Sequence, residues 1–232
     1  MELPARIEVL MRVPLFQGLG PEALKRVAGF AQERRVARDE AAFLQGDAAT
    51  HGYVVGWGRF RLEQATPEGQ NVVLRYMGPG DMLATVAVFR GIPLPATAVA
   101  VEDGLLLGWG APRLADLMAT EPPLAMNVVR LVGQRLEELQ LRLQEVATQR
   151  VERRIAAALL RLVRQSGRRG ERGVEIPFAL SRQDLAELTA TTLHTVSRTL
   201  SAWESAGIVE ARRSSHLTIL SPHKLVQIAE EA

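Results

Sequence analysis

Cysteine is absent from the 232-residue chain, and its absence excludes several kinds of chemistry at once. The sequence offers no disulfide scaffold, thiolate nucleophile, cysteine zinc site or cysteine-ligated iron–sulfur cluster. Long apolar segments are missing as well, since no run of about 18 uncharged apolar residues occurs. The N-terminus also lacks the compact apolar segment and small-residue cleavage site of a secretion signal. We therefore expect a soluble cytoplasmic protein that does not bind a membrane.

The net charge of +2 is small, but it is unevenly distributed along the chain. Residues 1–149 contain 15 basic and 17 acidic side chains, whereas residues 150–232 contain 13 and 9, a net charge of +4. Arginine supplies all but one of these C-terminal cations, and its planar guanidinium suits bidentate contacts with phosphates and bases. Charge alone leaves two interpretations open, nucleic-acid binding and a solvated basic surface.

Short apolar runs separated by glycine-rich turns occupy most of the N-terminal half. A turn over residues 14–21 precedes a predicted helix over residues 22–32. Six runs then predict strands at near-regular spacing, and this spacing favours a small antiparallel barrel or roll. The runs are residues 42–44, 53–55, 60–62, 72–76, 97–101 and 105–109.

A long segment from residue 124 to about residue 165 predicts a helix, because it contains no proline and only Gly133 as an interior breaker. Its apolar residues recur at alternating steps of three and four, the a and d spacing of a coiled coil. They are Val129, Val132, Leu136, Leu139, Leu143 and Val146. We favour a two-stranded dimer seam over a core helix, because the strand-rich half looks complete without this helix. Arg150 takes the next a position and ends the seam.

Two short helices joined by a tight turn are predicted after a polar, glycine-rich loop at residues 166–173. The helices cover residues 182–190 and 193–206. Ser181 and Asp184 have the spacing of a capping box, and Thr191 or Thr192 can cap the second helix. Gly207 fits the position just after that helix ends. The loop is either a phosphate-contacting arm or a solvated hairpin connection.

This helix-turn-helix predicts a DNA-binding surface, because the N-terminal part of the second helix enters the major groove in such units. Val196, Leu200 and Trp203 face inward and leave the opposite side for DNA. Arg198 is the best candidate for a bidentate guanine contact, whereas Arg182 and Thr192, at helix starts, suit phosphates. The full predicted set is Arg182, Thr192, Leu193, His194, Ser197 and Arg198. Two short strands around residues 212–215 predict a wing. An enzyme is disfavoured, because no HExxH, GxSxG or P-loop pattern occurs.

Motifs in both halves of the chain resemble the CRP/FNR family of bacterial dimeric transcription regulators. They are Pro14-Leu-Phe with Gly18-Leu, Gly46-Asp47, Tyr53-Val-Val, Gly58-Arg59, the heptad helix, Leu180-Ser-Arg-Gln-Asp-Leu-Ala, Thr195-Val-Ser-Arg-Thr-Leu and Gly207-Ile208. The resemblance spans nearly the whole chain. It implies an α+β protein with a cyclic-nucleotide-binding-like β-roll over residues 1–122, a dimerisation helix over 123–150 and a winged helix-turn-helix over 151–232. It also implies a homodimer on a palindromic double-stranded DNA site, with RNA polymerase as a further partner.

The cyclic AMP pocket of this family carries a Gly-Glu pair and an Arg-Ser pair, which align here with Ala84-Thr85 and Pro95-Ala96. Neither pair is present. A bound phosphodiester needs a cation or several N–H donors, and Pro95 has neither. We therefore reject a cyclic nucleotide as the ligand. The effector pocket itself is expected around Met82, Ala84, Thr85, Pro95 and Ala96.

Three sensing routes remain once the family's iron–sulfur mechanism is excluded: haem, a small organic effector, or no ligand. His51 is the one histidine of the sensor half and the candidate haem ligand, although a lone histidine before a strand is more often structural. Residues 95–98 and the Thr-Val-Ser-Arg helix look closer to the nitrogen-oxide and anaerobic branches of the family. Those relatives usually carry Glu at the position of His194, so the preferred DNA half-site is expected to differ.

Overall fold

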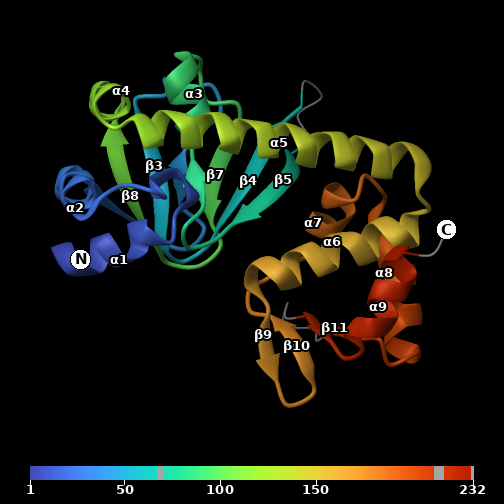
Figure 1. The fold of residues 1–232 in the computed structure, drawn as a ribbon. Helices are drawn as coiled ribbons and strands as arrows, with labels where there is room; N and C mark the ends of the chain where they lie inside the picture. The colour runs from blue at the N-terminus through green and yellow to red at the C-terminus, as the bar shows by residue number, and fades with distance from the viewer. Residues whose placement is uncertain (67–70, 212–216, 231–232) are drawn as a thin grey trace. The chain divides into compact units, whose positions relative to one another are not determined.

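The computed structural model describes residues 1–66, 71–211 and 217–230 (Figure 1). The chain divides into two compact units. The first comprises Met1–Asn71 and Arg75–Leu139, and the second comprises Val72–Leu74 and Gln140–Ala232. In the described part of the chain, no helix combines the length and hydropathy that a membrane span requires.

Two four-stranded sheets form a β-roll in the first unit, and all six predicted strands are confirmed. One sheet has the order β1 (Gln32–Val36), β8 (Gly104–Gly110), β3 (His51–Trp57), β6 (Met82–Leu83). The other has the order β2 (Ala41–Phe43), β7 (Thr97–Ala100), β4 (Phe60–Ala65), β5 (Asn71–Met77). Sequence analysis does not predict β1, because four of its five residues are polar or charged and only Val36 is buried. As an edge strand that pairs with β8 alone, β1 tolerates this composition.

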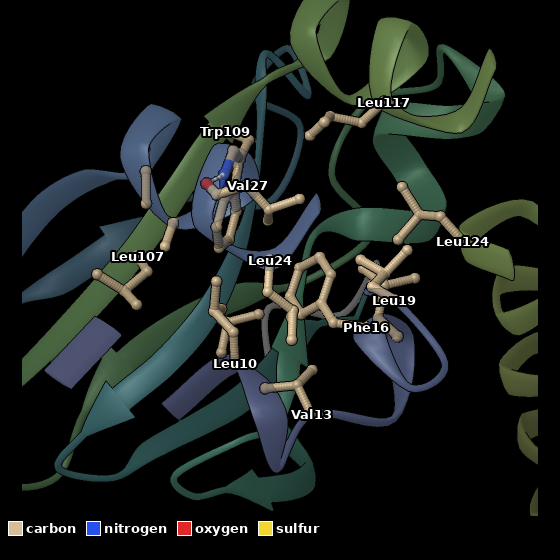
Figure 2. Close-up of a cluster of buried hydrophobic side chains, with 14 of the residues drawn as sticks. Leu10, Val13, Phe16, Leu19, Leu24, Val27, Leu107, Trp109, Leu117 and Leu124 are labelled. Atoms are coloured by element: carbon tan, nitrogen blue, oxygen red, sulfur yellow. Dashed lines mark hydrogen bonds between the residues drawn. The ribbon is translucent and has the colours of Figure 1, made fainter. Parts of the chain in front are cut away.

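Helices cover the roll and complete its main core. They are α1 (Leu3–Met11), the short 3₁₀ helix η1 (Pro14–Phe16), α2 (Pro21–Phe30), α3 (Thr85–Arg90) and α4 (Ala111–Thr120). Figure 2 shows how the buried side chains meet around Trp109, whose ring centroid lies 5.5 Å from that of Phe16. The Trp109 indole N–H donates to the carbonyl of Val27 at 2.8 Å, so this large side chain is buried without leaving its polar group unpaired.

The long helix α5 (Pro122–Thr148) begins in this core. Leu124 is fully buried, and the buried Asn127 amide donates to the carbonyls of Leu15 and Gln17 at 2.9 and 2.7 Å. The prediction of one helix from residue 124 to about residue 165 is wrong, because the structure has two helices over this range. The helix is interrupted after Thr148, and Arg150 is extended (φ −64°, ψ 153°) before α6 begins. After the interruption, α6 buries an apolar face of its own, which includes Ile155, Leu159 and Leu162.

The second unit contains the predicted winged helix-turn-helix. Its elements are α6 (Val151–Ser166), β9 (Arg168–Gly170), β10 (Gly173–Ile176), α7 (Arg182–Leu188), α8 (Leu193–Ser205), β11 (Val209–Ala211), β12 (Leu217–Ile219) and α9 (Pro222–Glu230). The two predicted wing strands are β11 and β12, whereas the wing tip at residues 212–216 lies outside the described residues. The polar loop at residues 166–173 contains β9 and forms a hairpin with β10.

The hairpin strands β9 and β10 belong to the same four-stranded sheet as β11 and β12. Its strand order is β11-β12-β10-β9. Val174 pairs with Ile219 and Ile176 with Leu217, so the hairpin tip at residues 170–173 lies beyond the Ile219 end of β12. Ala211 of β11 pairs with Leu217 at the other end of β12. The loop is therefore a β-hairpin connection, as one of the two interpretations expects.

Candidate nucleic-acid interface and sensor residues

The first helix of the helix-turn-helix begins at a complete capping box. The backbone N–H of Asp184 donates to the Ser181 hydroxyl at 2.9 Å, and the backbone N–H of Ser181 donates to the Asp184 carboxylate at 3.1 Å. Two backbone donors at the start of α7 are thereby satisfied. The predicted spacing is confirmed with Asp in place of the more common Glu or Gln.

The turn after α7 is stabilised by hydrogen bonds from an arginine that sequence analysis does not identify. Arg154, in the first turn of α6, donates from Nε to the Thr189 carbonyl at 2.9 Å and from Nη2 to the Ala190 carbonyl at 3.1 Å. Its Nη1 donates to the Gln149 carbonyl at 2.9 Å. A cation on the carbonyls that directly follow α7, at the C-cap Thr189 and at Ala190, also complements the negative end of the helix dipole. Nothing in local sequence spacing reveals this role, because the acceptors are backbone groups about 35 residues away.

The second helix, α8, is fixed at both ends and along one face. Thr192 caps it, accepting the Thr195 backbone N–H at 3.2 Å. Three side chains pack inward, as predicted: Val196, Leu200 and Trp203 are all buried. Just after the C-terminus of α8, Gly207 has a left-handed backbone (φ +64°). Its backbone N–H donates to the backbone carbonyl of Glu204 at 3.0 Å, and the Ile208 N–H donates to the backbone carbonyl of Trp203 at 2.8 Å. This pair of bonds is the Schellman motif, which only a residue tolerant of positive φ completes without strain.

The opposite face of α8 presents the predicted DNA-facing residues. Thr192, Leu193, His194 and Arg198 are exposed, and Ser197 is half-buried. Leu193 is 47% exposed, which is unusual for a large apolar side chain at a helix start and suits contact with a thymine methyl group. Arg198 has no hydrogen-bond or ion-pair partner among the described residues, so its five N–H donors are available to an external acceptor.

Arg182 differs from the other predicted residues because it already faces a carboxylate. Its Nη2 lies 3.9 Å from Oε2 of Glu204, near the end of α8. The other Glu204 oxygen accepts the backbone N–H of Ala211 at 2.9 Å, which ties α8 to the start of the wing. A phosphate contact from Arg182 therefore competes with this loose ion pair. Glu204 is a residue that sequence analysis misses, because its partners are set by tertiary structure.

The predicted dimer seam forms an uncovered apolar stripe on α5. All six of its residues are exposed, by 45 to 72%: Val129, Val132, Leu136, Leu139, Leu143 and Val146. Neighbouring residues on the other side of the helix, Val128 and Leu131, pack against the core of the first unit. An exposed stripe of this length on an otherwise amphipathic helix is typical of a surface that a partner helix covers.

The five predicted effector residues lie around the start of α3 and the start of β7. Ala84 has a left-handed backbone (φ +62°) just before α3, a conformation that ordinarily favours glycine. Thr85 is buried and donates to the Leu83 carbonyl at 3.2 Å, and Ala96 is also buried. Met82 is half-buried, whereas Pro95 is exposed. None of the five carries a charge, so the set cannot neutralise a phosphate by itself.

His51 starts β3 and is partly buried. Its Nδ1 lies 3.0 Å from the Thr50 hydroxyl, and its ring stacks on Tyr53 with centroids 6.0 Å apart. A hydrogen bond at one ring nitrogen is the usual arrangement of a metal-ligating histidine, so Nε2 is the nitrogen that would face a haem iron. Within the described ranges, no group of three or more His, Cys, Asp or Glu residues could hold a metal ion.

A β-roll, a long helix with an apolar stripe and a winged helix-turn-helix together define a class, the DNA-binding regulators that carry a separate sensor domain. Two family models match the chain, a cyclic nucleotide-binding domain over residues 33–121 and a Crp-like helix-turn-helix domain over residues 153–228. The Cyclic AMP receptor protein of Thermus thermophilus is 33% identical over 196 residues, which cover 84% of this chain and 88% of that protein. The chain belongs to the CRP/FNR family of transcription regulators.

Two further comparisons bear on the branch of the family. The solved structure of Thermus thermophilus Catabolite Activator Protein is 31% identical, has a TM-score of 0.55, and the match covers 93% of this chain and 98% of that one. The Fumarate nitrate reduction regulatory protein of Klebsiella oxytoca is 23% identical, with 87% of this chain and 80% of that protein covered. These identities do not favour the anaerobic branch that residues 95–98 and the Thr-Val-Ser-Arg helix suggest.

Proposed function

We propose that the protein is a homodimeric transcription regulator that binds a palindromic double-stranded DNA site through the exposed face of α8. One observation carries this proposal: Leu193, His194 and Arg198 project from a helix whose other face and both ends are fixed. A rigid helix with unpaired donors and an exposed apolar side chain matches the mixed acceptors and methyl groups of the major groove.

The proposal is tested by selecting a preferred duplex from DNA with randomised half-sites and measuring binding to it and to a random duplex. Arg198→Ala is expected to weaken binding to the selected duplex by about 1–3 kcal/mol, with little change for random DNA. The matched control is Arg169→Ala, which removes an exposed arginine of the same unit on the hairpin strand β9. Equal losses on both duplexes for Arg198→Ala would contradict a base contact.

The homodimer is supported by the apolar stripe on α5. A second copy of the same helix supplies a self-complementary surface, as a two-fold interface requires. Two helix-turn-helix units related by a two-fold axis then bind a palindrome. RNA polymerase, the partner implied by the family resemblance, and a cytoplasmic location belong to the same proposal.

For the signal, we propose a ligand other than cyclic AMP, because the predicted effector residues carry no cation. Haem held by His51 is one such signal. Protein produced with haem supplied would then show a Soret band that shifts with carbon monoxide and is lost in His51→Ala. Absence of haem uptake leaves an organic effector or effector-independent regulation.

A further inference from the structure

Glu204, close to the C-terminal end of α8, uses its two carboxylate oxygens on two different elements. Its Oε1 accepts the backbone N–H of Ala211, the last residue of β11, at 2.9 Å. Its Oε2 lies 3.9 Å from Nη2 of Arg182, the first residue of α7. One side chain of α8 therefore contacts both a wing strand and the other helix of the helix-turn-helix.

The two contacts of Glu204 differ in strength. The contact with Ala211 is a hydrogen bond from the backbone N–H of a half-buried residue to a charged acceptor, and such a bond is costly to lose. The contact with Arg182 is longer than a hydrogen bond, and the Arg182 and Glu204 side chains are 41% and 32% exposed. Ion pairs of this kind contribute little, because water and salt screen them. Glu204 therefore holds the end of β11 firmly and Arg182 loosely.

The loosely held partner is the arginine that the sequence predicts as a phosphate ligand. The planar guanidinium of Arg182 can donate two parallel hydrogen bonds to a phosphate group. In the part of the chain that the structure describes, Glu204 is the one carboxylate within 4.0 Å of this guanidinium. A phosphate that binds Arg182 displaces Glu204 and leaves an uncompensated negative charge close to the DNA backbone, which repels it.

We infer that Glu204 is a positioning residue for DNA binding and that its two oxygens have opposite effects on affinity. Oε1 positions the end of β11 against α8 and supports binding. Oε2 holds Arg182 back from the DNA backbone and weakens binding to any sequence. The affinity that is held back carries no sequence information, because it comes from a phosphate contact. The inference rests on the proposed function, since it concerns the DNA contacts of α7 and α8.

The test measures binding of the full chain to the selected duplex and to the random duplex over a range of sodium chloride concentrations. Glu204→Gln removes the charge but keeps an amide oxygen that can accept the Ala211 N–H. It should tighten binding to both duplexes by about fivefold. The slope of log affinity against log salt should steepen by about 0.9, as one added phosphate contact requires.

Glu204→Ala removes both the charge and the acceptor for the Ala211 N–H. It should steepen the salt slope as Glu204→Gln does, but it should bind the selected duplex more weakly than Glu204→Gln, because the end of β11 is no longer held. Circular dichroism checks that each variant is folded. Equal affinity of the two variants for the selected duplex would overturn the positioning role of Oε1.

Glu210→Gln is the matched control, because Glu210 is a carboxylate of β11 with a similar exposure of 31% and lies 3.0 Å from Arg172 instead of Arg182. When Arg182→Gln is also present, the effect of Glu204→Gln should fall below about twofold, whereas that of Glu210→Gln should not change. An unchanged salt slope in Glu204→Gln, or an undiminished effect beside Arg182→Gln, overturns the inference. The preference of the unmodified protein for the selected duplex tests the proposed function separately, so the two failures are distinguishable.

Discussion

Ala190, in the turn between α7 and α8, occupies a left-handed conformation (φ +49°) that costs an alanine about 1–2 kcal/mol. Glycine adopts it freely but loses about 0.4–1 kcal/mol more entropy on folding. Ala190→Gly is therefore expected to raise the free energy of unfolding by about 0.5 kcal/mol or slightly more. Chemical denaturation of the full chain, followed by circular dichroism, measures the difference.

Ala202→Gly serves as the control, because Ala202 is an exposed alanine within α8 and has no positive φ. Glycine at this helical position is expected to lower stability by about 1 kcal/mol. The two substitutions thus make the same chemical change with opposite signs. A loss of stability at both positions would show that the turn is not strained.

Single residues divide clearly into those that sequence predicts and those that it does not. The caps at Ser181 and Thr192 and the glycine after α8 act within four residues of their partners, so their spacing is sufficient to identify them. Arg154 and Glu204 bind backbone groups that only the tertiary fold brings near.

Among the elements, α5 offers a direct test of the dimer. Leu143, on the seam, and Leu141, off it, are 72% and 60% exposed on the same helix. In the proposed dimer, Leu143→Asp removes one buried leucine from each protomer, and each loss costs roughly 1.5 kcal/mol or more. The dissociation constant of the dimer should therefore rise by at least about 100-fold. Sedimentation across a concentration series measures this constant.

Leu141→Asp makes the same substitution outside the a and d positions and should leave the dimer unchanged. An effect of equal size at both positions would assign the interface to another face of α5. A dimer that is insensitive to both substitutions would remove α5 from the interface altogether.

At the scale of elements, periodicity predicts strands and helices well where burial follows the pattern. The runs at residues 53–55 and 105–109 lie in β3 and β8, which pair with each other over most of their length. Prediction fails for β1, a charged edge strand, and for the break between α5 and α6. At that break residues 149–150 carry no proline or glycine, so no local sequence signal marks the point where the helix stops.

For the whole molecule, the proposed two-fold dimer would fix the spacing of the DNA half-sites. Two recognition helices that enter successive major grooves on one face of the duplex lie about 34 Å, or one helical turn, apart. Inserting about five base pairs at the centre of the selected palindrome rotates one half-site to the opposite face. Affinity should then fall to the level of random DNA, as a mobility-shift titration would show.

Substituting the central base pairs without changing their number is the control for that experiment, and it should have a smaller effect. If both altered duplexes bind as the original does, one protomer suffices for recognition and the palindrome is not required.

At the scale of the whole molecule, the order of the parts can be predicted from motifs alone, because the glycine-punctuated roll, the heptads and the helix-turn-helix each have a distinct period. The ligand is not readable in the same way, because effector residues lie on separate strands and helices.

The contacts of Arg154 have a mechanical consequence. One guanidinium binds the Gln149 carbonyl at the junction of α5 and α6 and also the Thr189 and Ala190 carbonyls in the turn before α8. Three hydrogen bonds from a single guanidinium therefore stabilise the interruption between α5 and α6. One side chain thus joins the end of α5 directly to the turn before α8, although about 35 residues of chain separate Arg154 from that turn.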